Sequence, residues 1–166
     1  MTSHIIIGIM GPGHNVPELE QQLAQALGRA IAQQGWVLLT GGRPTGIMAA
    51  ASCGAAAVGG IVLGILPDDQ GDQVASGVTL PIVTGMGNAR NVINVLSSHG
   101  IIACGLGLGT VSEIALALKA KKPVVIMPNN PLAEEFFESL APGRFYMTDE
   151  ITLCINYLAS ALGQNV

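Results

Sequence analysis

The chain has 166 residues, a length typical of one domain that buries a sizeable core. With 49% hydrophobic residues, 11% charged residues and a net charge of −4, it has neither the basic surface that binds nucleic acid nor the basic helix that binds a membrane surface. So few charges on an apolar chain predict that copies of the chain cover part of its surface. The three cysteines are widely spaced and the first residues do not resemble a signal peptide, so we expect a cytoplasmic protein with reduced thiols.

Short apolar runs alternate with helical stretches along the whole chain. The expected strands are residues 4–10, 36–40, 61–66, 81–84, 101–104 and 123–127. Most of them are apolar throughout, which is typical of strands that are covered on both faces of a parallel sheet. Because proline has no N–H group for the sheet, Pro81 indicates that the fourth strand begins at this residue or lies at a sheet edge. The expected helices run from Pro17 to Gly35, after "GGRPTG" (41–46), over 88–98, from Thr110 to "KAKK" (119–122), over 132–140 and over 149–162.

This alternation predicts an α/β protein: a single three-layer, doubly wound Rossmann-like domain over residues 1–166 with a mainly parallel sheet. In such a sheet ligands bind beyond the carboxyl ends of the strands. Glycine-rich turns stand at those ends, namely "GPGH" (11–14), "GGRPTG" (41–46), "GMGNAR" (85–90) and "GLGLGT" (105–110). Glycines let backbone N–H groups approach an anion, and helix N-termini add partial positive charge.

We therefore expect these turns to bind the phosphate of a small ligand. The candidate residues are Gly11, Gly41, Gly42, Arg43, Thr45, Gly46, Gly87, Asn88, Arg90, Gly107, Leu108, Gly109 and Thr110. The "GLGLGT" turn is not a dinucleotide fingerprint, because Thr110 stands where that motif has its third glycine. No metal site is expected, since the histidines and cysteines show no metal-ligand spacing.

The scarcity of charge makes the position of each charge informative. Within residues 30–118 the only cations are Arg43 and Arg90, and within residues 73–133 the only acid is Glu113. Arg90 opens an expected helix, where a cation is unfavourable with the helix dipole, so we expect it to contact a ligand or pair with Glu113. Arg43 could bind a phosphate or be a solvated loop charge.

Glu113 admits two interpretations. The segment "TVSE" fits a capping box, in which Thr110 caps the helix and Glu113 reaches back to the Thr110 N–H group. The same glutamate stands one turn into the helix, next to the expected ligand site, where it could act on the ligand.

Several motifs resemble a known family. "GGRPTGIMAAASCGAAAVGG" and "GLGLGTVSE" resemble the group that contains the LOG phosphoribohydrolases, and "GGRPTGIM", "GILPDD", "GMGNARN" and "KKPVVIM" resemble its molybdenum cofactor carrier branch more closely. The resemblance covers about residues 5–127. It implies a homo-oligomer, tetramer or dimer, that holds the phosphorylated pterin of molybdenum cofactor, protects it from oxidation and passes it to molybdoenzymes.

The enzymes of the same group imply an alternative. Their signature Pro-Gly-Gly-x-Gly-Thr-x-x-Glu is matched at residues 109–113, but its leading Pro-Gly is replaced at 105–106. The lysine that follows their upstream arginine is Asn91 here, after Arg90. The resemblance thus implies a carrier without catalytic residues. The alternative is a nucleoside 5′-monophosphate phosphoribohydrolase that releases free base, with Arg90 and Glu113 as its catalytic residues.

Overall fold

The computed structural model describes residues 4–164, so part of the N-terminal stretch assessed for a signal peptide lies outside the described residues. The strands are β1 (Ile6–Met10), β2 (Val37–Thr40), β3 (Val62–Leu66), β4 (Leu80–Val83), β5 (Gly100–Cys104), β6 (Val124–Met127) and β7 (Tyr146–Met147). The helices are α1 (Glu18–Gln33), α2 (Gly46–Ala56), α3 (Arg90–Ser97), α4 (Leu108–Lys119), α5 (Pro131–Leu140) and α6 (Ile151–Ala161). A short 3₁₀ turn, Gly87–Ala89, leads into α3. The six expected strands and six expected helices are confirmed, and β7 was not predicted.

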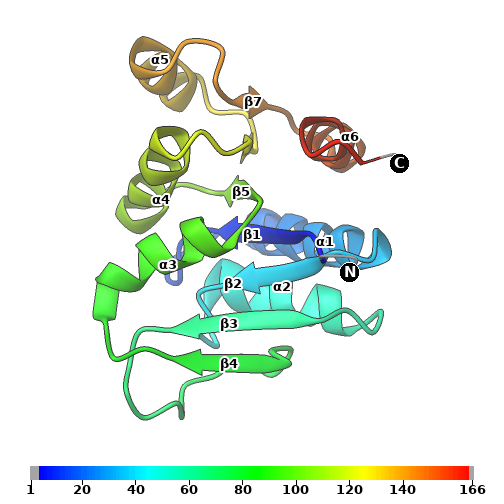
Figure 1. Ribbon diagram of the computed structural model, residues 1–166, viewed down its shortest axis with the longest axis vertical. Coiled ribbons are helices and arrows are strands. Elements are labelled where there is room, and N and C mark those ends of the chain that lie inside the picture. Colours follow the sequence, from blue (N-terminus) through cyan, green and yellow to red (C-terminus); the bar gives the residue numbers. More distant parts are fainter. Residues whose placement is uncertain (1–3, 165–166) are drawn as a thin grey trace.

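The strands form one parallel sheet in the order β4-β3-β2-β1-β5-β6-β7. Figure 1 shows them stacked from β4 at the bottom to β7 near the top. The helices α1, α2 and α6 contribute to the core on one face, and α3, α4 and α5 to the core on the other. This confirms the three-layer, doubly wound α/β architecture. Pro81 lies in β4 at the exposed edge of the sheet, as its missing N–H group requires.

Two apolar cores hold the three layers together. Leu27 of α1 and Ile47 of α2 are fully buried against one face of the sheet. Ile114 of α4 and Phe137 of α5 are buried against the other face. Burial of each large apolar side chain contributes about 1.5–3 kcal/mol, which explains why the strands are apolar on both faces. None of the helices within residues 4–164 is long and apolar enough to cross a membrane.

The winding of the chain reverses next to β1. From β1 the chain moves outward through β2 and β3 to β4, and it then returns across the sheet to β5 on the other side of β1. The loops that follow β1 and β5 therefore diverge to opposite faces. Such a switch point leaves a crevice at the carboxyl ends of the strands, where α/β proteins bind ligands.

The helices α1 and α2 approach each other through two glycines. A Cβ atom on Gly28 would collide with the backbone carbonyl of Ala51, and one on Gly54 would collide with that of Gln25. Only glycine allows two helix backbones to lie this close. The contact fixes α1 against α2, the two helices that follow the turns after β1 and β2.

We expect Gly28→Ala and Gly54→Ala to lower the free energy of unfolding by about 1–3 kcal/mol each, because the added methyl groups meet rigid backbone. Gly109→Ala is the matched control, since its Cβ would meet only Asn91 Nδ2, at 3.9 Å. Urea unfolding of the three variants measures the difference. Equal stabilities for all three would contradict the proposed backbone contact.

Candidate ligand-binding site

A pocket of about 340 Å³ lies at the carboxyl ends of β1, β2 and β5. Its volume is in the range of small-molecule sites, about 300–1,000 Å³. Residues 11–14 after β1, Gly41 after β2 and the start of α4 at 107–110 form three of its walls. Asn88 and Arg90, at the start of α3, form the fourth. The pocket therefore lies at the topological switch point.

The structure brings most of the sequence-based candidates together. Those that line the pocket are Gly11, Gly41, Asn88, Arg90, Gly107, Leu108, Gly109 and Thr110. The candidates outside its lining are Gly42, Arg43, Thr45, Gly46 and Gly87. Sequence reasoning did not select Ile9, Met10, Pro12, Gly13, Met48 and Asn91, which also line it. His14 is exposed and lies at the pocket as well.

The first turn of α4 faces the pocket without a capping side chain. The helix begins at Leu108, and its N-cap is Gly107 in an extended conformation with no side-chain hydrogen bond. The expectation of a capping box at Thr110 and Glu113 is therefore wrong. Gly105, with φ of 72°, turns the chain sharply out of β5, so the helix starts two residues earlier than the pattern indicated. The first N–H groups of a helix have no intrahelical partner, and here they are available to a ligand.

Thr110 adds an unused hydroxyl to this helix start. The residue is 2% exposed and lines the pocket. Its Oγ1 atom is buried and has no hydrogen-bond partner within residues 4–164. A buried polar atom without a partner costs free energy, which a ligand that hydrogen-bonds to it would recover.

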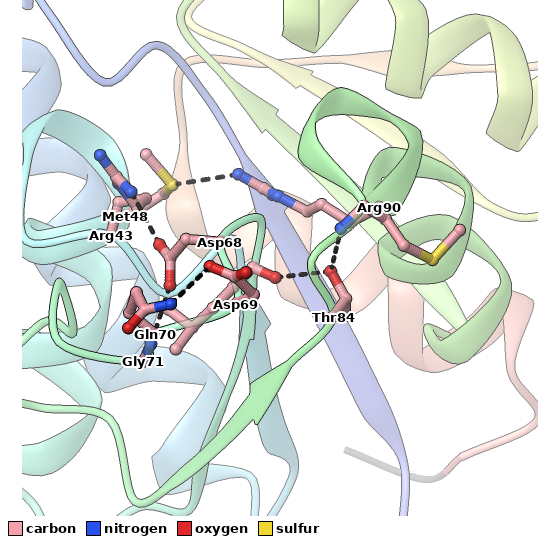
Figure 2. Close-up of polar contacts among 10 residues, drawn as sticks. Arg43, Met48, Asp68, Asp69, Gln70, Gly71, Thr84 and Arg90 are labelled. Atoms are coloured by element: carbon pink, nitrogen blue, oxygen red, sulfur yellow. Dashed lines mark hydrogen bonds and ion pairs between the residues drawn. The ribbon is translucent and has the colours of Figure 1, made fainter.

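Arg90 presents an unpaired cation to the same pocket. Its guanidinium packs over Gly41, and Nη2 lies 4.0 Å from Met48 Sδ (Figure 2). Its Nε atom is buried and lacks a partner among the described residues, and no carboxylate lies within salt-bridge distance of it there. Burial lowers the pKa of Arg90, and the nearby Glu113 opposes the shift. An arginine remains protonated even so, and a half-buried cation without a counter-ion favours an anionic ligand.

Arg43, the other candidate cation, is paired inside its own loop region. Its Nη1 atom lies 2.9 Å from Asp68 Oδ2 (Figure 2). Asp68 also accepts a hydrogen bond from the Gly71 N–H group at 3.0 Å. The Gly71 N–H and the Arg43 guanidinium lower the pKa of Asp68. Arg43 is thus paired with a carboxylate and is not part of the pocket lining, although its charge is close enough to act on the pKa of Arg90.

Glu113 is held by a partner that sequence reasoning missed. Its side chain is 5% exposed, and its Oε1 atom accepts a hydrogen bond of 2.8 Å from Asn94 Nδ2. Burial raises the pKa of Glu113 to about 7, while the Asn94 hydrogen bond and the charge of Arg90 act in the opposite direction. Asn94 is fully buried on α3, one turn after Arg90. An asparagine within the apolar segment "VINVL" (92–96) was the available signal.

The described residues show no metal-binding group. Within residues 4–164, no three His, Cys, Asp or Glu side chains are placed to hold a metal ion. Cys104 and Cys154 are buried, and burial raises the pKa of each thiol to about 12. The pocket therefore offers an arginine, a carboxyl group, a hydroxyl and backbone N–H groups, a set suited to an anion with hydrogen-bonding substituents.

A glycine-lined pocket at the switch point of a parallel sheet defines a Rossmann-like ligand-binding protein. The model of the SLOG cluster4 family matches residues 4–152, so the chain belongs to the SLOG cluster4 family.

Solved structures resemble it over nearly the whole chain. The molybdenum cofactor binding protein from the phototrophic bacterium Rippkaea orientalis is 46% identical, with a TM-score of 0.95 over 98% of this chain and 99% of that one. The Moco carrier protein from Chlamydomonas reinhardtii is 45% identical, with a TM-score of 0.90 over 97% of this chain and 99% of that one. An uncharacterized protein from Archaeoglobus fulgidus is 44% identical over 118 residues, 71% of this chain and 76% of that protein. These relatives confirm the resemblance to the carrier branch.

The raised pKa of Glu113 makes stability depend on pH. The folded state holds this proton more tightly than the unfolded state, in which the pKa is about 4.5. The stabilisation is therefore complete below about pH 4.5 and is lost as the pH rises through about 7. Relative to Glu113→Gln, which cannot ionise, the parent should lose up to about 3 kcal/mol of unfolding free energy across this range. Urea unfolding at several pH values compares the two, and parallel profiles would contradict the shift.

Proposed function

We propose that this protein binds and carries molybdenum cofactor, the phosphorylated molybdopterin, and that it breaks no bond in doing so. The observation that carries the proposal is the unpaired Arg90 beside the uncapped start of α4. The similar proteins support the choice of ligand. A molybdenum cofactor binding protein and a Moco carrier protein are 45–46% identical to this chain over nearly its whole length.

The pocket residues fit the phosphate of such a ligand. The N–H groups at Gly107–Thr110 would donate hydrogen bonds to it, and the α4 dipole would favour its charge. Thr110 Oγ1 would donate another hydrogen bond, and the Arg90 guanidinium would neutralise charge. The ring system would lie against Ile9 and Met48, which line the pocket.

Glu113 would orient these groups without performing chemistry. Its carboxyl lies at the pocket, close enough to Arg90 to act on its pKa. A protonated Glu113 would donate a hydrogen bond to a ligand oxygen and would not repel the phosphate. The cofactor supplies the metal and the redox chemistry to the enzyme that receives it. Until then, this chain would shield the cofactor from water and oxidants.

The cellular setting that we propose follows from this role. The protein would be a single-domain, cytoplasmic homo-oligomer, a tetramer or dimer, that delivers the cofactor to molybdoenzymes. The apolar composition supports an assembly, because 49% hydrophobic residues leave much apolar surface to cover.

We expect Arg90→Ala to raise the Kd for molybdenum cofactor about tenfold to hundredfold, since a hydrogen bond to a charged group contributes about 1.5–3 kcal/mol. Arg43→Ala is the matched control and should bind like the parent, because Arg43 pairs with Asp68 outside the pocket lining. Anaerobic fluorescence titration with the purified cofactor measures both values, with inorganic phosphate as a competitor. Weak binding by Arg43→Ala alone would move the phosphate site to the β2 turn.

A second candidate function rests on Arg90 and Glu113 lining one pocket, with the pKa of Glu113 near 7. A carboxyl group with such a pKa suits acid–base work, so a nucleoside 5′-monophosphate phosphoribohydrolase is the alternative. For the carrier, we expect no free base after incubation with a panel of nucleoside 5′-monophosphates, measured by chromatography. Base release that disappears in Glu113→Gln would instead make this chain an enzyme.

A further inference from the structure

The ligand pocket contains a carboxyl group as well as a cation. Among the described residues that line the pocket, Glu113 is the only acid. Its Oε1 atom accepts the hydrogen bond from Asn94 Nδ2, so α3 fixes the orientation of the carboxyl. Its Oε2 atom has no hydrogen-bond partner within residues 4–164 and is not fully buried, so it is accessible from the pocket. In a pocket of about 340 Å³, an anion bound to Arg90 therefore lies close to this carboxyl.

The polar groups around Glu113 are left incomplete by the protein itself. Within the described part of the chain, the buried side-chain atoms without a hydrogen-bond partner are Arg90 Nε, Thr110 Oγ1 and Asn94 Oδ1. Arg90 and Thr110 line the pocket with Glu113, and Asn94 is its hydrogen-bond donor. Buried polar atoms are normally paired, so a cluster of unpaired ones indicates a ligand with several polar atoms.

Arg90 is the charged group that faces Glu113 from the elements packed against α4. The helix α3 carries no other charged residue, and β5 and β6 carry no acidic or basic side chain. Cys104 ends β5, but burial raises the pKa of its thiol to about 12, so the thiol is uncharged. On α4 itself the remaining charge is Lys119, at the last residue of the helix.

The turns around the pocket add three further charged or titratable groups. His14 lies at the pocket in the loop after β1, and Glu20 of α1 lies beside Gly105, at the turn that precedes α4. Arg43 is paired with a carboxylate outside the pocket lining and acts on the pKa of Arg90. Arg90 is the charge that acts on the pKa of Glu113.

We propose that Glu113 and a bound anion compete for Arg90, and that a proton on Glu113 Oε2 decides the competition in favour of the anion. The protonated carboxyl is uncharged and donates a hydrogen bond from Oε2 to a ligand oxygen. The ionised carboxyl repels the anion and offsets the charge of Arg90 from within the protein. Anion binding is therefore coupled to the uptake of a proton from solvent. The inference rests on the proposed function in needing an anion in this pocket, and it adds how that anion is released.

The sign of the pH effect follows from the two states. The pKa of Glu113 is about 7 without a ligand, and a bound anion raises it further, because nearby like charges disfavour ionisation. Below that pH the carboxyl is protonated in both states, and the affinity is constant. Above it the free protein loses the proton first, so the Kd rises by about tenfold per pH unit until the bound state also ionises.

Isothermal titration calorimetry of the full chain with inorganic sulfate tests the coupling, because sulfate keeps its charge across this pH range. We expect the Kd for sulfate to be about tenfold higher at about pH 8.5 than at about pH 6. Titrations at about pH 8 in buffers of different ionisation enthalpy should show the uptake of up to about one proton per sulfate. The proton count needs no substitution, so it does not depend on how any variant folds.

Three variants separate Glu113 from the other groups at the pocket. Glu113→Gln keeps an oxygen for Asn94 and cannot ionise, so its Kd should be nearly independent of pH and close to the low-pH value of the parent. His14→Gln is the matched control, because a protonated histidine would also attract an anion at low pH, and it should keep the coupling. Arg90→Ala should lose most of the sulfate binding at every pH.

A parent Kd that is equal at the two pH values would overturn the inference, and so would a pH dependence that Glu113→Gln retains. Loss of the dependence in His14→Gln would assign the proton to the histidine instead. Failure of the parent to bind sulfate at the lower pH would overturn it as well. The cofactor titration of Arg90→Ala tests the carrier function separately, since tight cofactor binding without proton uptake would contradict this inference alone.

Discussion

The reversal of chain winding at β1 is the constraint on which the site depends. Because β1 lies between β2 and β5, the loops after β1 and β5 leave the sheet on opposite sides. The gap between them exposes the start of α4, and α3 returns across the sheet with Arg90 at its first residue. Neither feature would reach the pocket if the strands followed one another in sequence order. The site is therefore a property of the topology as much as of its residues.

The two candidate arginines differ in whether the fold provides a carboxylate to pair with each. Arg43 and Arg90 both follow strands, and both were candidates for binding an anion. The loop after β3 supplies Asp68 to Arg43, which satisfies that charge locally. Within residues 4–164, Arg90 has a thioether contact and no ion pair, and the charges of Glu113 and Arg43 shift its pKa in opposite directions. A charge that the fold leaves without a partner, at partial burial, is the one available to a ligand.

The amino-acid pattern predicted most of the architecture because buried parallel strands are apolar on both faces and short glycine-rich turns separate them. It missed β7, since Tyr146–Met147 is too short for any periodicity to show. The predicted start of α4 was wrong because "TVSE" satisfies a local capping rule. In the structure, the chain turns at Gly105 and the helix begins before that motif, at Leu108. Asn94 was missed because its contact with Glu113 joins two helices 19 residues apart, and no local pattern encodes that contact.

The close packing of α1 against α2 bears on how the pocket responds to a ligand. The Ile47 N–H group donates a hydrogen bond of 3.1 Å to the Pro12 carbonyl, which ties the loop after β1 to the start of α2. Gly28 and Gly54 also pack the two helices backbone to backbone, so this side of the pocket is built on backbone contacts. A ligand that binds against it would meet groups that are already ordered, and less entropy would be lost there than at a wall that must order on binding.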